Sequence, residues 1–181
     1  MTHSTQLVYQ KASLQLTDLQ AFYRLRNEPR DLLWSGYKEP HAFESFEHWY
    51  KQQLRREDRT IWLMKTLETQ QKTVGYLYLT QQTQQRPTAA VLSVGVSERY
   101  AGLGFASKGI NFLLNFCLNA HNFDQIIAWI ASENIASAKS FLHNGFLKTE
   151  ISQKIFYESF DQYLTLEQYE FPTQNYPNRA V

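Results

Sequence analysis

The sequence of 181 residues has little of three things: it holds a single cysteine, no surplus of charge of either sign and no long apolar run. Cys117 alone cannot close a disulfide within the chain or build a cysteine cluster for a metal, and we predict no metal site. The 18 basic and 17 acidic residues leave a formal net charge of +1. This near-neutral balance argues against a protein that binds nucleic acid or a membrane surface.

The missing apolar run has its own consequence. A membrane-spanning helix needs about 20 mostly apolar residues in succession, and no stretch approaches that length. The first ten residues, MTHSTQLVYQ, contain neither the charged region nor the apolar region of a signal peptide. We therefore expect a cytoplasmic protein without a membrane segment.

The chain does have enough apolar and aromatic content to form a core. Hydrophobic residues make up 43% of the sequence and aromatic residues 15%. The length fits one domain, and no repeat or linker divides it. We predict a single domain over residues 1–171 and a C-terminal tail over residues 172–181. Cys117 falls on the apolar face of a predicted helix, where a small core residue is expected.

The first half of the chain combines strand-like runs with two helical patterns. Short polar connections separate the strands, which favours antiparallel hairpins over crossovers. The stretch after Pro29, which contains Trp34, Tyr37 and Pro40, is predicted to be irregular. The predicted strands are Leu7–Lys11, Thr60–Lys65, Thr73–Thr80 and Ala89–Ser97, and the predicted helices run from Thr17 to Arg26 and from Phe43 to Arg55.

In the second half, helices and strands alternate. The predicted helices are Gly104–Ala120 and Ile135–His143, and the predicted strands are Gln125–Ala131, Phe146–Tyr157 and Tyr163–Phe171. The first of these helices joins two strands and so makes a βαβ unit. The predicted fold class is α/β with a mixed (α+β) sheet, mostly antiparallel, with one βαβ crossover and flanking helices.

A glycine turn joins the strand Ala89–Ser97 to the helix behind it. Val91–Ala106 reads VLSVGVSERYAGLGFA, so Gly102 and Gly104 come just before the first helical turn. Glycines let backbone N–H groups turn toward an anion, and the N-terminus of a helix carries a partial positive charge. The stretch therefore predicts a pyrophosphate site.

Two common phosphate motifs do not fit this turn. The dinucleotide fingerprint needs a third glycine where Ser107 stands and an acid at the end of the next strand, whereas Asp124 precedes that strand. The phosphate loop of nucleotide hydrolases needs Lys followed by Ser or Thr, but Gly109 follows Lys108. We expect neither a nicotinamide site nor a nucleotide-hydrolase site.

A third motif, Arg99-x-x-Gly102-x-Gly104 before a helix, resembles the acetyl-CoA-binding motif of the GCN5-related N-acetyltransferase (GNAT) family. Members of that family also carry an Asn, a small residue three positions later, and Gly-Phe eleven and twelve positions later. The matching residues here are Asn134, Ser137, Gly145 and Phe146. The order of elements matches as well, over about residues 7–171. The resemblance implies the GNAT fold and acetyl-CoA as the cosubstrate.

The resemblance also implies a path for acetyl-CoA. Val94 and Val96 would offer strand backbone to the pantetheine arm, and Asn134 would contact it, cap its own helix, or do both. Gly95 marks either a bulge that separates this strand from Gln125–Ala131 or a plain small strand residue. The residues of the pyrophosphate motif are Arg99, Tyr100, Ala101, Gly102, Leu103, Gly104, Phe105 and Ala106.

The family's chemistry is direct attack of a neutral amine on the thioester carbonyl. Many members protonate the leaving thiolate with a tyrosine seven residues after the asparagine, and this chain has Phe141 there, beside the cofactor. Ser137 is the alternative partner of the thiolate, or else a plain serine at a helix start. A free thiol has a pKa of about 8.5, so its departure as thiolate near neutral pH needs limited help.

An alkylamine titrates near pH 10, so a base or a chain of waters must remove a proton from it. Glu28, at the break after the first helix, and Asp161, in the last hairpin, fall where the family builds its acceptor cleft, and we predict them as the catalytic carboxylates. A surface position without a catalytic role is the alternative for each. The other titratable candidates are His41, Glu47, His48, Glu98 and His143.

Two branches of the family share features with the acceptor half. Arg26-Asn27-x-Pro29 and the run Ser45–Trp49 resemble both the ribosomal-protein alanine and serine N-acetyltransferases and the enzymes that acetylate nucleotide-linked amino sugars. Trp34 and Tyr37 would form one wall of an aromatic cleft that suits a peptide or a small amine. We therefore predict an N-acetyltransferase for a protein N-terminus or a small amine, as a monomer or homodimer. The alternatives are a nucleotide-amino-sugar N-acetyltransferase and, because the usual acid is missing, a non-catalytic acyl-CoA-binding module.

Overall fold

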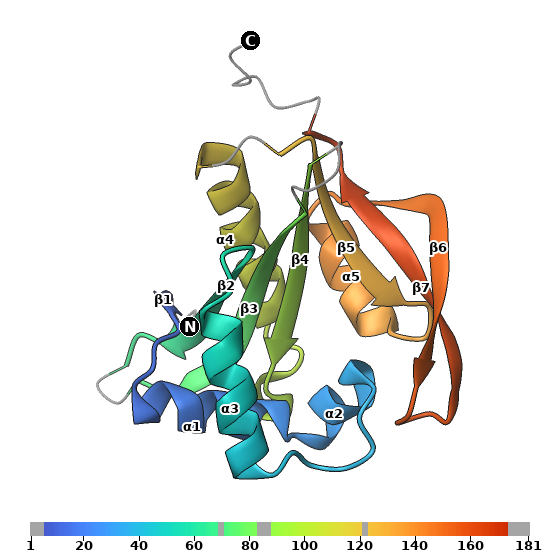
Figure 1. Cartoon of the computed structure of the whole chain (residues 1–181). Coiled ribbons are helices and arrows are strands. Elements are labelled where there is room, and N and C mark those ends of the chain that lie inside the picture. Colours follow the sequence, from blue (N-terminus) through green and yellow to red (C-terminus); the bar gives the residue numbers. More distant parts are fainter. Residues whose placement is uncertain (1–5, 69–70, 83–87, 121–122, 174–181) are drawn as a thin grey trace.

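The computed structural model describes residues 6–68, 71–82, 88–120 and 123–173. A seven-stranded sheet with the order β1-β2-β3-β4-β5-β7-β6 lies at their centre (Figure 1). Its strands are β1 (Leu7–Lys11), β2 (Arg59–Thr66), β3 (Thr73–Gln82), β4 (Ala89–Val96), β5 (Gln125–Ala131), β6 (Leu147–Tyr157) and β7 (Gln162–Phe171). Every strand predicted from the sequence is confirmed, with ends that differ by at most two residues.

Five α-helices and a short 3-10 turn accompany the sheet in the described residues. They are α1 (Leu16–Arg26), α2 (Pro29–Ser35), α3 (Phe43–Leu54), the 3-10 turn η1 (Glu98–Tyr100), α4 (Phe105–Ala120) and α5 (Ile135–His143). None of these helices is long and apolar enough to cross a membrane. Residues 174–181 of the predicted tail lie outside the described part of the chain.

The sheet is mixed, as predicted. All neighbouring strands pair antiparallel except β4 and β5, which run parallel and are joined through α4. The parallel pairing covers only Ala89–Val91 against Gln125–Ile127. Beyond Val91 the two strands are no longer partners, so β4 and β5 form a fork near the middle of the sheet. The fork leaves backbone groups of Leu92–Val96 unpaired on the side of β4 that faces β5.

Apolar side chains cover both faces of the sheet, because residues along a strand point alternately to one face and the other. Leu77 and Leu79 of β3 belong to the cluster that includes α4 and α5 side chains. Tyr76 belongs to the opposite cluster, under α1 and α3, with the fully buried Phe22. Figure 1 shows α1 and α3 on one side of the sheet and α4 on the other. Each large side chain buried in this way contributes on the order of 2 kcal/mol.

Helix α2 corrects the sequence prediction, which treated the stretch after Pro29 as irregular. Pro29 stands at the first helical position, and Gly36 ends the helix with a φ of 84°. Both residues are typical of helix ends, because proline has no N–H to lose there and glycine tolerates the left-handed conformation. The helix meets the β6–β7 hairpin, where the Ser159 hydroxyl donates to the Leu33 carbonyl at 2.7 Å. It thereby links the N-terminal half of the chain to its last two strands.

Candidate active site

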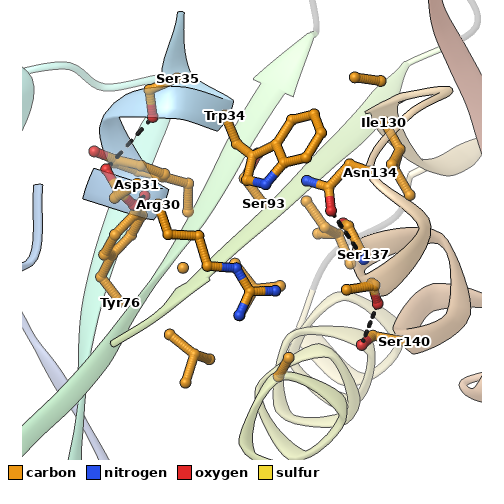
Figure 2. Close-up of a pocket in the computed structure, with 18 of the residues that line it drawn as sticks. Arg30, Asp31, Trp34, Ser35, Tyr76, Ser93, Ile130, Asn134, Ser137 and Ser140 are labelled. Carbon is orange, nitrogen blue, oxygen red and sulfur yellow. Dashed lines mark hydrogen bonds between the residues drawn. The ribbon is translucent and has the colours of Figure 1, made fainter. Parts of the chain in front are cut away.

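A cavity of about 720 Å³ lies at the fork between β4 and β5 (Figure 2). Strand residues Leu92–Val96 and Trp129–Ala131 form two of its walls. The glycine turn and the start of α5 lie at one end, and residues of α1, α2, α3, β2 and β3 line the other. We call the part made by the fork, the glycine turn and α5 the cofactor half, after the acetyl-CoA site predicted from the sequence, and the part made by α1, α2, α3, β2 and β3 the acceptor half.

The glycine turn has the geometry of an anion site. Gly102 and Gly104 have φ angles of 77° and 75°, a conformation that favours glycine, and a Cβ at either would meet no atom within 4 Å. The first hydrogen bond of α4 runs from Lys108 N to Gly104 O at 3.1 Å, so the N–H groups before it have no acceptor within the helix. These N–H groups and the empty space beside the glycines fit the pyrophosphate of acetyl-CoA.

Gly95 lies in an unbroken register between β3 and β4, opposite Tyr76. A Cβ at this position would lie 2.3 Å from atoms of the Tyr76 ring. The fork, moreover, has already opened at Val91. Of the two interpretations of Gly95, the structure supports the small strand residue, and the bulge is wrong.

Helix α5 brings three predicted residues to the cavity. The Asn134 side chain accepts a hydrogen bond from Ser137 N at 3.2 Å, so it caps the helix while it lines the cavity. Phe141 is 2% exposed and lies edge-on to Phe146, and its side chain has no hydrogen-bond donor. Ser137 stands one turn before Phe141 and also lines the cavity (Figure 2). Among the described residues, none forms a hydrogen bond with its hydroxyl.

The cavity brings together most of the predicted cofactor residues. Those that line it are Val94, Val96, Tyr100, Ala101, Gly102, Gly104, Phe105, Ala106, Asn134 and Phe141. The side chains of Arg99 and Leu103 are exposed and are not part of its wall. Of the residues predicted for the acceptor cleft, Trp34 and Tyr37 do line it.

The predicted carboxylates stand outside the wall of the cavity. Glu28 precedes α2, and its Oε2 accepts a hydrogen bond from Glu98 N at 2.7 Å. Its negative charge reaches Asp31, which does line the cavity. Asp161 is exposed in the β6–β7 hairpin, has a φ of 54°, and its N–H donates to the Glu158 carbonyl. A catalytic role for either carboxylate stays a prediction.

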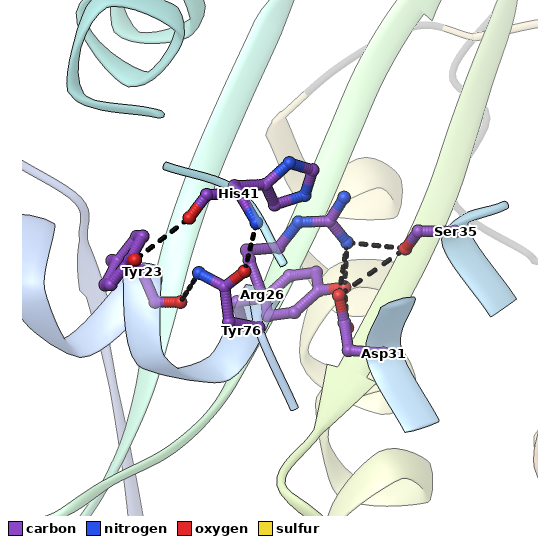
Figure 3. A network of polar contacts seen from close by, with 7 residues as sticks. Tyr23, Arg26, Asp31, Ser35, His41 and Tyr76 are labelled. Atoms are coloured by element: carbon purple, nitrogen blue, oxygen red, sulfur yellow. Dashed lines mark hydrogen bonds and ion pairs between the residues drawn. The ribbon is translucent and has the colours of Figure 1, made fainter. Parts of the chain in front are cut away.

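A buried polar network, which the sequence did not reveal, forms the floor of the acceptor half (Figure 3). Nη1 of Arg26 donates to Asp31 Oδ2 at 2.6 Å, to Ser35 Oγ at 2.7 Å and to the Tyr76 hydroxyl at 2.8 Å. The Tyr76 hydroxyl in turn donates to the other carboxylate oxygen of Asp31. Arg26 is only 8% exposed. Both Asp31 oxygens are therefore engaged within the protein.

Burial and the neighbouring groups together determine the protonation of this network. Burial disfavours the Arg26 cation, but the nearby Tyr76 and Asp31 outweigh it and raise the pKa of Arg26. Burial also raises the pKa of Asp31 against the opposing effect of Arg26, and it raises the pKa of Tyr76 well above its ordinary value. Tyr78 beside them reaches a pKa of about 12 for the same reason. The two tyrosines stay protonated at neutral pH, so neither can serve as the base.

One signal in the sequence indicates that Arg26 needs a buried partner, although it does not identify that partner. Leu19, Phe22 and Leu25 form the buried face of α1, and Arg26 comes four positions after Phe22 on that same face. A charged residue on an apolar face needs a buried partner or a function. Tyr76 alternates with Leu77 along β3, which places it toward α1. Contacts between such distant segments are not visible in the sequence.

A smaller pocket of about 220 Å³ adjoins the acceptor half. It is lined by Arg26, Tyr37, His41, Ala42, Ser45, Phe46 and Trp49, of which three also line the main cavity. Two aromatic residues of α3 have distinct positions: Phe46 is buried in the core and also lines this pocket, while Trp49 lines both cavities. Burial and the positive charge of Arg26 lower the pKa of His41.

Cys117 takes no part in either cavity. It is 1% exposed within the cluster between the sheet and α4, as predicted for a core residue. Burial raises the pKa of its thiol to about 12, so the thiolate that would make it reactive does not form at neutral pH.

Comparison with solved structures shows where this fold occurs. A spermidine N-acetyltransferase from Vibrio cholerae, in complex with CoA and spermine, matches with a TM-score of 0.77 and 18% sequence identity, over 92% of this chain and 95% of that chain. A domain from Methanocaldococcus jannaschii matches with a TM-score of 0.71 and 19% identity, over 92% and 99% of the two chains. No protein with a curated description matches the sequence. At such identities the likeness is one of fold.

The sequence itself matches a family as well. The family model described as "Acetyltransferase (GNAT) domain" covers residues 12–147, which is more than half of the chain. The matched part contains the glycine turn, the fork and the start of α5, and these are the elements that fit acetyl-CoA. The chain therefore belongs to the GNAT acetyltransferase family, as an N-acyltransferase that uses acetyl-CoA as its cosubstrate.

Proposed function

We propose that the protein transfers the acetyl group of acetyl-CoA to a primary amine that enters the acceptor half of the cavity. The continuity of this cavity carries the proposal, because one space joins the glycine turn and the fork to the Arg26 network. The pyrophosphate would bind at Gly102–Ala106, and the pantetheine arm would lie along the unpaired edge of Val94–Val96 as an added strand does. The thioester would then face the acceptor half.

The proposed chemistry is a direct transfer. The neutral amine nitrogen attacks the thioester carbonyl carbon, a C–N bond forms, the C–S bond breaks, and CoA leaves as thiolate. The Ser137 hydroxyl, which lines the cavity beside Asn134, would donate a hydrogen bond to that sulfur as Phe141 cannot. The proton that the amine loses would pass through water to a carboxylate.

Glu28 and Asp161 remain the proposed carboxylates, and Glu28 is better placed, since it directly precedes α2, whose residues Arg30, Asp31 and Trp34 line the cavity. Glu28→Gln keeps an oxygen that can accept from Glu98 N but removes the base. If Glu28 accepts the proton, kcat falls on the order of tenfold to a hundredfold and the acid limb of the pH profile is lost. Asp161→Asn is the matched change in the hairpin. Unchanged pH profiles in both variants would contradict a role for either residue.

The acceptor proposed from the sequence is a protein N-terminus or a small amine, with an amino group of a nucleotide-linked sugar as the alternative. The aromatic wall of Trp34, Tyr37 and Trp49 supports an acceptor with an apolar part. The V. cholerae neighbour was solved with spermine, which supports a small amine as a class.

The proposed function is tested by following thiol release from acetyl-CoA with a panel of N-terminal peptides, amino acids, polyamines and amino sugars. Turnover that requires a primary amine and yields its N-acetyl product is the expected result. Tight CoA binding without turnover on any amine of the panel would contradict the proposal. The Ser137→Ala variant in the same assay separates acid catalysis from binding.

A further inference from the structure

The pocket beside the acceptor half holds polar chemistry that acetyl transfer does not use. Its volume of about 220 Å³ suits a small group, and it opens beside the main cavity through the shared residues Arg26, Tyr37 and Trp49. Phe46 and Ala42 give it an apolar lining, and Ser45 lies at an exposed position on its rim. Arg26 is the one permanently charged residue among those that line it.

Arg26 keeps one edge of its guanidinium free. Its three hydrogen bonds to described residues, the carboxylate of Asp31 and two hydroxyls, all leave from Nη1. Within the described chain, Nε is buried and has no partner at all. A buried donor without a partner is rare and costly in a native protein. Nε and Nη2 together form the edge that meets a carboxylate with two parallel hydrogen bonds.

The pyrophosphate of CoA does not explain this free edge. Arg26 bonds to Tyr76, whose ring lies in the cluster under α1 and α3. The helix that would bind pyrophosphate, α4, packs on the opposite face of the sheet. The oxygen that would satisfy Arg26 Nε therefore does not come from the pyrophosphate.

The charges of the cavity wall point the same way. The charged residues that line the main cavity are Arg26, Arg30, Arg59 and Asp31, three cations and one anion. Both oxygens of the single carboxylate already accept hydrogen bonds, from Arg26 and Tyr76. Burial raises the pKa of Tyr78, and the positive charges of Arg26 and Arg59 act against it; the Arg59 guanidinium lies 5.2 Å from the centre of the Tyr78 ring. A second ammonium group of a polyamine would find no free carboxylate in this wall, whereas an anion would find free donors.

We propose that the acceptor is an amine that also carries a carboxylate, and that the Nε–Nη2 edge of Arg26 binds this carboxylate in the side pocket. The inference rests on the proposed acetyl transfer. It narrows the acceptor to small amino acids whose apolar part would lie against Trp49 and Phe46. The pocket is built to hold its shape. His41 N donates to Asn27 Oδ1 at 2.6 Å, and the Tyr23 hydroxyl donates to the His41 carbonyl at 2.9 Å (Figure 3).

The first test compares acceptors that differ only in the carboxylate. Thiol release is measured with phenylalanine and with ω-amino acids from glycine to 6-aminohexanoate, each beside its carboxamide, and with spermine. The acids should exceed their amides in kcat/KM by about tenfold or more, because a buried charge-assisted pair is lost in the amide. Equal values for acids and amides, or a preference for spermine, would overturn the carboxylate site and leave amine acetylation standing.

The second test changes the pocket without touching its floor. Ser45→Glu places a negative charge at the exposed rim, and Ser45→Gln adds the same bulk without the charge. We expect Ser45→Glu to raise KM for the acids about three- to tenfold and to leave KM for the amides close to that of Ser45→Gln. Indistinguishable KM values for the two variants would overturn the proposal.

A binding measurement separates this inference from the proposed function. Calorimetry with 3-phenylpropionate, which has no amine, is carried out on the protein with CoA present, for the wild type, Arg26→Lys and Ser45→Glu. Binding that both variants weaken supports the carboxylate site even if no amine is acetylated, in which case the proposed function alone fails. If 3-phenylpropionate does not bind to the wild-type protein, and acids and amides react equally in the first test, the carboxylate site is overturned.

Discussion

The two halves of the cavity differ in the groups that line them, which are mainly backbone groups in one half and side chains in the other. The cofactor half presents backbone: N–H groups of a glycine turn and the unpaired edge of Leu92–Val96. The acceptor half presents side chains, with Arg26 of α1, Asp31 of α2 and Tyr76 of β3 joined in one buried network. In the proposed binding mode, backbone would bind a cosubstrate that stays the same, whereas side chains could be exchanged one by one to suit an acceptor. The comparison predicts that most substitutions impair one half and spare the other.

The largest expected effect breaks the acceptor half. Arg26→Met leaves Asp31 buried without its cation and should lower the free energy of unfolding by about 3–5 kcal/mol. Urea unfolding measures this loss, and the double variant Arg26→Met/Asp31→Leu should regain most of it. If the single and double variants lose the same stability, Arg26 and Asp31 do not act as one energetic unit.

The pH dependence of Arg26→Met follows from the raised pKa of Asp31. A carboxyl group with a pKa above its unfolded value binds protons more tightly in the folded state. Its contribution to stability is therefore complete below the unfolded pKa of 3.8 and declines as the pH rises through the folded value. Without Arg26 the pKa of Asp31 rises further, so the stability deficit of the variant should shrink as the pH falls toward 4.

The next largest effect is a loss of CoA affinity through a change confined to the cofactor half. Gly102→Asp forces an L-residue into a φ of 77° and places a negative charge where the pyrophosphate would bind. We expect CoA affinity to fall about 30- to 100-fold, since the backbone strain alone costs roughly 1–2 kcal/mol and like charges add to it. Calorimetric titration with CoA gives the ratio.

Leu103→Asp is the matched control for Gly102→Asp. It adds the same charge one residue along, on a side chain that is 59% exposed and does not line the cavity. Its loss of affinity should be clearly smaller. Equal losses in the two variants would mean that charge near the turn, and not the glycine geometry, controls CoA binding.

A smaller effect is expected for Ser137, at the proposed position of the thioester between the two halves. Ser137→Ala should lower kcat about tenfold and leave KM for acetyl-CoA unchanged, because the hydroxyl is needed only as sulfur departs. Ser140→Ala is the control on the same helix, since its hydroxyl lines the cavity but donates to the Ala136 carbonyl. Phe141→Tyr in the Ser137→Ala background should restore part of the rate. A Ser137→Ala enzyme with normal kcat would remove the serine from the mechanism.

The smallest expected effect is a shift in the pKa of His41, which reports on the positive charge in the acceptor half. The pKa of His41 lies below 6.5, because of burial and then of Arg26, and should move up in Arg26→Gln. Since the folded protein binds this proton less tightly than the unfolded chain, His41 costs stability at acidic pH, and the cost disappears as the pH rises to 6.5. NMR titration of the His41 ring protons measures the shift. A value that does not change in Arg26→Gln would contradict the proximity of the two charges.

The same contrast explains how much of the site could be predicted from the sequence. A backbone site needs glycines at fixed spacing before a helix, so Gly102, Gly104 and Asn134 could be placed without a structure. Strands and most helices followed from the alternation and spacing of apolar residues. The helix α2 was missed although Pro29 and Gly36 are ordinary end signals, because the apolar residues between them, Leu32, Leu33 and Trp34, follow one another directly and show no helical spacing.

The acceptor network could not have been found in this way. Arg26 and Tyr76 are 50 positions apart, and only the packing of α1 on the sheet brings them within 2.8 Å. Charge counting could not reveal the acceptor half either, because a net charge of +1 for the chain does not show that one cavity wall holds three arginines and one aspartate. Local patterns predict local structure, whereas long-range contacts depend on the whole fold.

Gly95 sets a limit to the independence of the two halves. Its missing Cβ leaves the space in which the Tyr76 ring lies, and Tyr76 holds Asp31 and Arg26 in place. The same residue sits in the strand edge along which pantetheine would run. In the proposed binding mode, substitutions at Ser45 or Trp49 would change the acceptor site and spare the cofactor site, whereas any side chain at position 95 would meet the Tyr76 ring and disturb both sites. The absence of a side chain at Gly95 thus couples two proposed binding sites that could otherwise change independently in evolution.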